Sequence, residues 1–445
     1  MSVLRRPELG PLALVGYRRE RLTEACFTVG PALMEGGFIG VIADKLFHVH
    51  PAVLALVTAA PMFGNLSSSF WARHAHGRRR VPIATALMAG FAGCVALVAL
   101  VPEGPVGAWL LVGALVAARL LLGGIVTLRS VVWTLNYPRE SRGRVTARLG
   151  VISTLCIAAT AWLGGQVLDR NPENFRFVYA VGAALAAAGV VAFSRVPLAG
   201  EIDHLALERE SATSVAGAPS AFSVLRDDRM YLRFLAWQMV LGIANMMIEA
   251  PLLYLVSREM GASYSTAIGI TIVIPFALSV LTIPFWALYL DRVHVSAFRA
   301  VHSWTFAASQ VLLWGGAALQ SLALIGLARV VMGAARSGGG LAWNIGHNDF
   351  APSERAGVYM GVHVTLTGIR GAFAPFLGMA LYLGWSARAL PGLGVSLPAW
   401  SGLGDALMGV AAALSALSAI GFRRLQRRIE RQTATDSSRA PGTSE

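Results

Sequence analysis

Twelve long apolar stretches alternate with short polar segments along this chain of 445 residues. A helix needs roughly 20 apolar residues to cross the hydrocarbon of a bilayer, and each stretch is close to that length. We predict spans near residues 24–43, 51–71, 82–101, 108–128, 147–168, 177–196, 234–255, 264–288, 300–318, 321–343, 358–384 and 402–422. The pattern therefore predicts an all-α polytopic membrane protein with about 12 transmembrane helices.

Composition agrees with this fold class. Apolar side chains make up 55% of the residues and charged ones only 14%, and the mean hydropathy is +0.60. A chain of this composition has too little polar surface to cover a water-soluble globule. The three cysteines, Cys26, Cys94 and Cys156, all fall within predicted spans, so the sequence indicates neither a disulfide framework nor thiol chemistry.

The second half of the sequence repeats features of the first at a shift of about 210 to 215 residues. The matched positions are Glu24 with Gln238, Glu35 with Glu249, Arg119 with Arg329 and Trp133 with Trp343. Many secondary transporters are built from such duplicated halves. We therefore predict two pseudo-symmetric six-helix bundles, at residues 23–196 and 234–422, joined by a cytoplasmic linker at 197–233.

Basic residues are distributed unevenly among the predicted loops. The loops on the same side as the N-terminal segment hold 27 of the 37 Lys and Arg residues, and the opposite loops hold 5. Because basic residues near span ends are retained in the cytoplasm, we predict that residues 1–22 and a largely disordered tail at 423–445 are cytoplasmic. The membrane is then the inner (plasma) membrane. The formal charge of +13 is spread over the inner loops and forms no concentrated face for nucleic acid.

Several predicted inner loops carry short motifs. They are Gly77-Arg78-Arg79 after the second span, Asp291-Arg292 after the eighth, and residues 138–143 after the fourth, which are matched by 352–357 after the tenth. With these motifs and its repeat, the chain resembles the major facilitator superfamily over nearly its whole length. His74 stands where the family's first loop has an aspartate, and His294 stands where its second-half loop has a glycine.

The resemblance implies a fold of two bundles in which spans one, four, seven and ten line a central cavity. It also implies that the inner loops fasten one conformation through charge pairs between helix ends. The candidate residues for such a latch are Gly77, Arg78, Arg79, Arg142, Asp291, Arg292 and Arg355. The alternative is that these residues only mark the cytoplasmic side.

Ionisable side chains within the predicted spans are the best candidates for a functional site. Each costs about 2.5–3.5 kcal/mol at a helix centre, so such groups usually face protein or a watery cavity. With the amides that share a helix face with them, the candidates are Glu35, Arg119, Gln238, Asn245, Glu249, Arg329, Arg336 and Arg370. Their depths along the helices allow Glu35 to meet Arg119, and Glu249 to meet Arg329. We predict one Glu/Arg pair in each half, facing a common binding site.

These pairs suggest a mechanism. The spacing Arg119-x-x-x-Gly123, repeated as Arg329-x-x-x-Gly333, resembles a fourth-span motif of the family that is linked to proton handling. A substrate anion that takes over the arginine leaves the glutamate unpaired and easier to protonate. We predict a secondary active transporter that moves a small organic, anionic solute by alternating access, with protons as the coupling ion, and that functions as a monomer in the lipid bilayer.

Other functions are less well supported by the sequence. Static Glu/Arg bridges would suit a transport-inactive membrane sensor or assembly scaffold with the same fold. A membrane enzyme acting on lipid would need a reactive cluster, for which only His347, Asn348 and Asp349 come close, and we favour a helix-cap role for Asp349. We predict no enzyme activity, cofactor or metal, because nucleotide-binding and hydrolase motifs do not occur and the two His-x-His pairs lack a ligand cluster.

Overall fold

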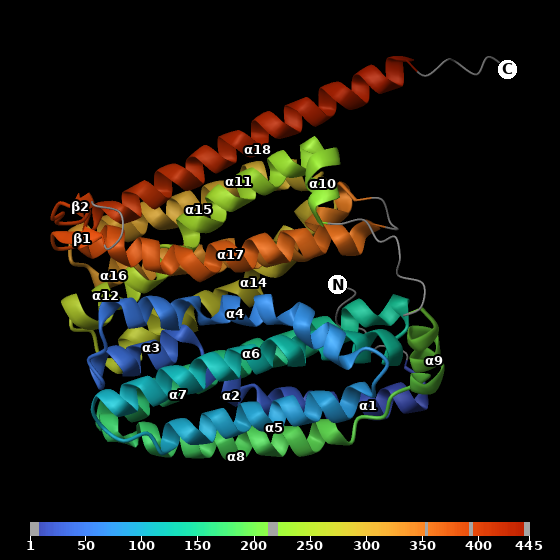
Figure 1. Cartoon of the computed structure of the whole chain (residues 1–445), viewed down its shortest axis with the longest axis horizontal. Helices are drawn as coiled ribbons and strands as arrows, with labels where there is room; N and C mark the ends of the chain where they lie inside the picture. The colour runs from blue at the N-terminus through green and yellow to red at the C-terminus, as the bar shows by residue number, and fades with distance from the viewer. Residues whose placement is uncertain (1–8, 212–220, 352–354, 391–394, 440–445) are drawn as a thin grey trace. The chain divides into compact units, whose positions relative to one another are not determined.

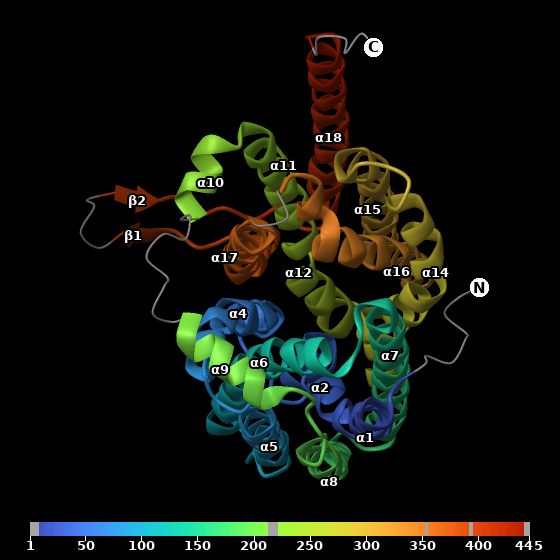
Figure 2. The ribbon, with the colours of Figure 1, turned by 90° about the vertical axis from the view of Figure 1, so that its right-hand side faces the viewer.

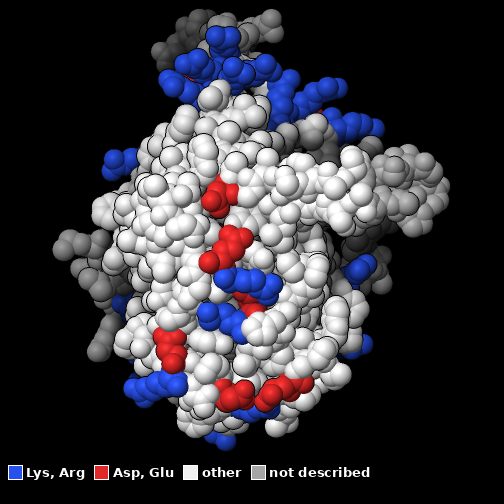
Figure 3. Space-filling view, turned by 90° about the vertical axis from the view of Figure 1, so that its left-hand side faces the viewer, with Lys and Arg blue, Asp and Glu red and all other residues white. Residues whose placement is uncertain are grey.

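In the computed structural model, which describes residues 9–211, 221–351, 355–390 and 395–439, almost all elements are helices. Eleven of the described helical segments are long and apolar enough to cross a membrane, and they overlap eleven predicted spans. The remaining predicted span, the ninth, is occupied by α15 (Val295–Ala318). Large apolar side chains such as Trp109 and Phe285 are exposed on the helices, and uncharged residues form most of the surface seen in Figure 3. The protein is a multi-pass membrane protein.

The helices group into two compact units. The first unit contains α1 (Pro11–Phe27), α2 (Val29–Leu33), α3 (Gly36–Lys45), α4 (Pro51–Ala75), α5 (Arg80–Ala99), α6 (Pro105–Asn136), α7 (Arg139–Arg170), a 3-10 turn (Pro172–Asn174), α8 (Phe175–Ser194) and α9 (Glu201–Ser211). Its long helices lie side by side, with α5 against α6 and α8, and α6 against α4 (Figure 1). The short α9 lies across one end of this bundle (Figure 2).

Residues 250–277 also belong to the first unit. They comprise most of α12 (Glu249–Tyr254), a π-helical turn (Leu255–Glu259), α13 (Tyr264–Ile268), a second π-helical turn (Gly269–Val273) and the start of α14 (Ile274–Leu290). The contacts of this segment are with α3 and α7. Gly165 of α7 permits the approach, because a Cβ there would lie 2.9 Å from the Cα of Ser265. The internal repeat assigns the same residues to the second half of the sequence.

The second unit contains residues 219–249 and 278–445. Its elements are α10 (Ala221–Asp227), α11 (Arg229–Met246), the larger part of α14, α15, α16 (Leu322–Ile345), a 3-10 turn (Gly346–Asp349), α17 (Ala356–Leu383) and α18 (Ala406–Arg439), with a short hairpin between the last two helices. The helix α15 packs between α16 and α18, and α11 packs against α17 and α18. Aromatic side chains, among them Phe234, Phe298 and Phe422, form the core between these helices.

The first span differs from its prediction. The helix begins at Pro11 rather than near residue 24, and it is interrupted at Thr28 and again at Met34 and Glu35. Proline is favoured at the first position of a helix, where its missing N–H costs nothing. The polar residues after Pro11 can lie within the bundle because several of them form ion pairs with another helix of this unit. The predicted N-terminal segment at residues 1–22 is therefore partly helical, and residues 1–8 lie outside the described part.

The two ends of the second unit hold further differences. The tail that the sequence predicts as disordered continues α18 as far as Arg439, since extending an existing helix requires no new nucleus; residues 440–445 lie outside the described part. A short antiparallel hairpin of β1 (Arg388–Leu390) and β2 (Val395–Leu397) was not predicted. Next to it, Trp385 and Trp400 exchange two backbone hydrogen bonds of 2.8 and 2.9 Å.

Candidate functional site

Glu35 lies at the second interruption of the first span. It has an extended conformation (φ −72°, ψ 137°) and immediately precedes α3, which begins at Gly36. A carboxylate at this position is favoured by the partial positive charge of the helix N-terminus. Position 37 needs a glycine because α3 comes very close to the second π-helical turn here. A Cβ on Gly37 would lie 2.8 Å from Oγ1 of Thr271.

Arg119 of α6 binds at this interruption. Its Nη2 lies 2.8 Å from Oε2 of Glu35 and also donates a hydrogen bond of 2.5 Å to the carbonyl oxygen of Met34, which the break leaves without a helical partner. The guanidinium is buried, whereas the Glu35 side chain is 26% exposed. The predicted ion pair is therefore confirmed, and its acid is the member that water can reach.

A close helix contact fixes the height of Arg119. One turn further along α6, a Cβ on Gly123 would lie 2.2 Å from the carbonyl oxygen of Gly64 in α4, so the two backbones touch. On the same stretch, the Trp71 indole of α4 donates a hydrogen bond of 2.8 Å to the carbonyl of Leu120. Gly123 therefore permits the close approach of α6 to α4.

The second unit repeats the arrangement. Its seventh span is broken after Met246, and Glu249 is the first residue of the helix that follows, α12. Nη1 of Arg329 on α16 lies 3.5 Å from Oε1 of Glu249. Again the arginine is buried while the glutamate side chain is 35% exposed. The second predicted ion pair is thus also confirmed, and both glutamates stand at breaks that the sequence analysis did not foresee.

The other predicted site residues of the second unit lie on α11, α16 and α17. Arg370 of α17 is buried and donates a hydrogen bond of 2.6 Å to the carbonyl oxygen of Gln238 on α11. The side-chain oxygens of Gln238 and Asn245 are buried and accept no hydrogen bond within the described part of the chain. Arg336 is exposed on α16.

A second charged group of the first unit was missed by sequence reasoning. Nη2 of Arg129 on α6 lies 3.2 Å from Oε2 of Glu20 and 2.5 Å from Oε1 of Glu24, and all three side chains are buried. The indole of Trp133 and the hydroxyl of Tyr137 also donate to Glu20. The available signal was the spacing of four between the glutamates, which places both on one face of a helix.

The predicted latch residues after the second span meet α9 of the linker. The N–H of Gly77 donates to Oε2 of Glu208 at 2.9 Å, and Arg79 pairs with Glu201 at 3.1 Å. The strongest contact belongs to Arg80, a residue not among the candidates, whose buried Nη2 lies 2.6 Å from the same Glu208 oxygen. The guanidinium of Arg78 has His74 as its polar neighbour, at 3.4 Å.

The electrostatics of Glu208 reflect these contacts. Burial acts to raise its pKa, but the Gly77 N–H and the Arg80 guanidinium outweigh burial and hold the pKa below its usual value. The carboxylate is thus kept charged by the loop that it binds.

The remaining latch candidates act on helix ends or line surface pockets. Arg142 donates to the carbonyls of Thr134 and Tyr137, at 2.9 and 3.2 Å, and so caps the end of α6. Arg355 lines a surface pocket beside Asp228. The neighbouring residues 352–354 of the predicted motif lie outside the described part.

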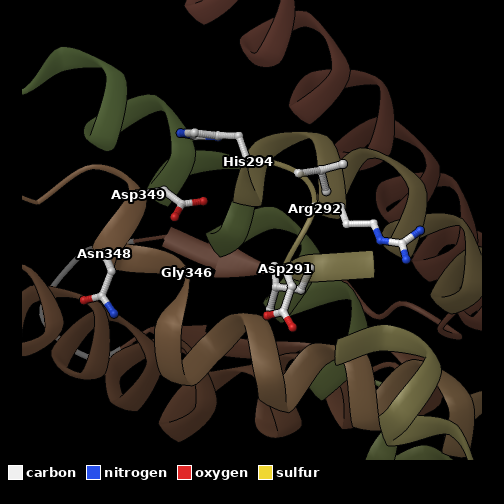
Figure 4. Close-up of a pocket in the computed structure, with 8 residues that line it drawn as sticks. Asp291, Arg292, His294, Gly346, Asn348 and Asp349 are labelled. Atoms are coloured by element: carbon white, nitrogen blue, oxygen red, sulfur yellow. The ribbon is translucent and has the colours of Figure 1, made fainter. Parts of the chain in front are cut away.

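Asp291 and Arg292 line a pocket of about 540 Å³ together with His294 and Asp349 (Figure 4). Within the described residues, neither Asp291 nor Arg292 forms an ion pair. Oδ2 of Asp349 accepts a hydrogen bond of 2.6 Å from the N–H of Val295, the first residue of α15. The predicted cap role of Asp349 is therefore confirmed. Burial lowers the pKa of His294, against an opposing effect of Asp349.

A polar group at the end of α3 was also missed. Asp44 is buried, forms an ion pair with the guanidinium of Arg258 and accepts a hydrogen bond from the hydroxyl of Ser257. Beside it, Nζ of Lys45 donates to the carbonyl of Ala262 at 2.8 Å. These contacts join α3 to the segment 250–277 of the same unit. Sequence reasoning had treated both basic residues only as loop charges.

Comparison with known proteins identifies the fold. Similar solved structures include the nucleoside transporter NupG (15% identity, TM-score 0.64, covering 94% of this chain and 99% of that one), a D-xylose-proton symporter (14%, 0.65, 92% and 97%) and a POT family transporter in complex with 5-aminolevulinic acid (12%, 0.66, 96% and 100%). No curated protein is significantly similar in sequence. Residues 26–265, more than half of the chain, match the model of the Major Facilitator Superfamily. With this match, the chain belongs to the major facilitator superfamily.

Proposed function

We propose that this protein is a secondary active transporter that moves a small, anionic organic solute across the inner membrane by alternating access, coupled to protons through Glu35 and Glu249. The observation that carries the proposal is the matched pair of ion pairs. In each unit a partly exposed glutamate stands at a break in its span and binds a buried arginine. Broken helices that present charged groups are a recurrent way to build transporter sites.

The geometry supports an exchange of partners. A buried guanidinium needs an anionic partner, because an unpaired charge in the interior is costly. Either the glutamate or a carboxylate of the solute can fill that role, because guanidinium N–H groups donate to both in the same way. When the solute takes the arginine, the displaced glutamate is the exposed member of the pair and accepts a proton from water. Solute and proton occupancy are coupled in this way without a covalent step.

Two groups of contacts are suited to hold alternate states. On the predicted outer side, Asp44 and Arg258 fasten the segment 250–277 to α3. On the predicted inner side, Arg80 and Glu208 fasten α9 to the loop after α4. Each ion pair has one buried member, and it is lost entirely when the elements separate. We assign the outer group to the state in which the outer path is closed.

The experiment begins with a thermal-shift screen of the purified protein against organic acids, sugars, nucleosides and peptides. The solute that stabilises the protein is then used for flux measurements in proteoliposomes with and without a pH gradient. Glu35→Gln and Glu249→Gln are expected to retain solute binding and to lose the dependence of flux on the gradient. Glu103→Gln is the matched control, because Glu103 is exposed in a loop of the first unit.

Two results would overturn the proposal. If both glutamine variants keep the wild-type dependence of flux on pH, the two glutamates do not carry the coupling. If the stabilising solute binds but is not moved across the membrane under any gradient, the protein is a sensor or scaffold with the fold of a transporter.

A further inference from the structure

Within the part of the second unit that the structure describes, the interior contains positive charge that no carboxylate balances. Arg299 of α15 and Arg370 of α17 are 2% and 5% exposed. Among the described residues, neither forms an ion pair. This contrasts with Arg119, Arg129 and Arg329, each of which binds a glutamate.

The contacts of Arg299 are weak for a buried guanidinium. Its Nη2 donates to the carbonyl of Gly339 at 3.3 Å, and its Nη1 approaches Nδ1 of His302 at 3.4 Å. The other ring nitrogen of His302 lies 2.7 Å from the carbonyl of Ala335, so Nε2 carries the proton and Nδ1 is the acceptor. Nε of Arg299 is buried without a hydrogen-bond partner.

Arg370 is held from one side only. Its one hydrogen bond to a described residue goes to the carbonyl of Gln238, and its Nε is buried without a partner among those residues. A Cβ on Gly242 would lie 2.3 Å from Cζ of Arg370, so the guanidinium rests directly on the α11 backbone. The charges of Arg299 and Arg370 are close enough to repel each other.

His363 completes the group. It lies seven residues before Arg370 on α17, its ring packs against Trp343 at 5.6 Å between centroids, and its buried Nε2 has no partner. It experiences the charges of both arginines. The carboxylates on neighbouring elements are used elsewhere: Asp228 accepts from the hydroxyl of Tyr359, and Asp349 caps α15.

From this placement we infer that Arg299, Arg370 and His363 form a binding site for a compact oxyanion, a carboxylate or phosphate group, inside the second unit. An anion there would neutralise two repelling guanidinium groups and accept from donors that now lack acceptors. The site is distinct from the Glu249–Arg329 ion pair, which is already balanced. The inference does not depend on the proposed transport activity, since it concerns binding alone.

The test measures thermal unfolding of the detergent-purified full chain while anions are titrated against chloride at constant ionic strength. The probes are inorganic phosphate, acetate and short-chain phosphatidylglycerol, so that a free anion and a lipid headgroup are distinguished. At least one probe is expected to raise the Tm of the wild type. Arg299→Gln and Arg370→Gln are expected to weaken the apparent affinity for that probe at least tenfold. Arg423→Gln, which removes an exposed arginine from α18 of the same unit, serves as the control and should respond like the wild type.

The unfolding temperature without added anion separates this site from a structural role. Each glutamine variant removes an unbalanced buried charge, so it should unfold no earlier than the wild type in chloride. An arginine needed for packing would instead lower the Tm when replaced, and that result counts against the inference. A wild type that responds to none of the three probes, or glutamine variants that respond as the wild type does, would overturn it.

Discussion

Two charged groups on the same pair of spans differ in how many partners they have. Arg119 binds a single glutamate whose side chain is 26% exposed. Ten residues further along α6, Arg129 binds two buried glutamates and lies over the Trp133 ring at 5.0 Å. The first group can exchange its partner with little rearrangement, whereas loss of Arg129 from the second would leave two buried glutamates without a cation. Ionisable residues in one stripe of a membrane helix thus divide into exchangeable and structural ones by exposure and number of partners.

Removal of Arg129 should have the largest effect. Arg129→Gln leaves Glu20 and Glu24 buried without a cation, which is expected to lower the free energy of unfolding by about 3–5 kcal/mol. Arg18→Gln removes an exposed arginine from the same helix as the glutamates and should leave stability nearly unchanged. Denaturant unfolding of the detergent-purified protein measures both. Equal stability of the two variants would mean that the buried cluster is not structural.

The close contact between α6 and α4 beside Arg119 provides a second test of the comparison between the two charged groups. Gly123→Ala drives a methyl group into the Gly64 carbonyl, so we expect a loss of about 1–3 kcal/mol. It should also lower solute flux, because Arg119 lies one turn away on the same helix. Gly113→Ala is the control, since a Cβ at Gly113 has no atom within 4 Å. Wild-type flux and stability in the Gly123 variant would contradict the proposed positioning of Arg119.

Removing the hydroxyl of Tyr137 tests how much the hydrogen-bond donors around the buried glutamates contribute to stability. Burial and the adjacent Glu20 raise the pKa of Tyr137, so the hydroxyl keeps its proton and remains a donor. Tyr137→Phe should cost about 1.5 kcal/mol, because the lost hydrogen bond of 3.0 Å goes to a charged group. Tyr179→Phe loses a bond of 2.8 Å to the neutral carbonyl of Leu33 and should cost less. Thermal unfolding compares the two, and a reversed order would contradict the larger contribution assigned to the hydrogen bond with Glu20.

Breaking the contact between α9 and the loop after α4 should have the smallest and most local effect. This contact also depends on pH. The pKa of Glu208 is lower in the folded protein than its ordinary value of 4.5. Its contribution is therefore complete above the unfolded pKa and is lost as the pH falls through the folded pKa. The protection of the α9 amides against hydrogen exchange, relative to the intrinsic rate at each pH, should fall in acid, and Glu208→Gln should show the lower protection at neutral pH. Asp203→Asn on the exposed side of α9 should not; if it does, general charge loss explains the effect.

Sequence reasoning located the spans well because hydrophobic length is a property of each segment by itself. It also found the two Glu/Arg ion pairs, since duplication placed matching residues at matching depths. It placed Glu20 outside the membrane because a run rich in arginine reads as polar, although Arg129 from a distant part of the chain compensates it. Tertiary partners decide such cases, and they are not visible in a local window.

The same limit applies to residues at span borders. Arg80, Arg258 and Arg299 each lie near a predicted helix end, where basic residues usually mark topology. In the structure Arg80 and Arg299 are buried, and Arg258 binds the buried Asp44. The breaks at Glu35 and Glu249 had weak signals in Gly36, Gly37 and Pro251, which are equally compatible with continuous helices in membranes.

The hydrogen bond from Arg119 to the carbonyl of Met34 has a consequence for ligand affinity. A guanidinium that is hydrogen-bonded to the backbone keeps its position whichever anion it binds. It therefore loses little conformational entropy when a ligand replaces Glu35. Binding strength is then governed by the anion's own fit and desolvation rather than by the ordering of a long side chain. Ligands that differ only in the bulk attached to the same anionic group should accordingly share a common anchoring contribution, and selectivity among them must come from other surfaces.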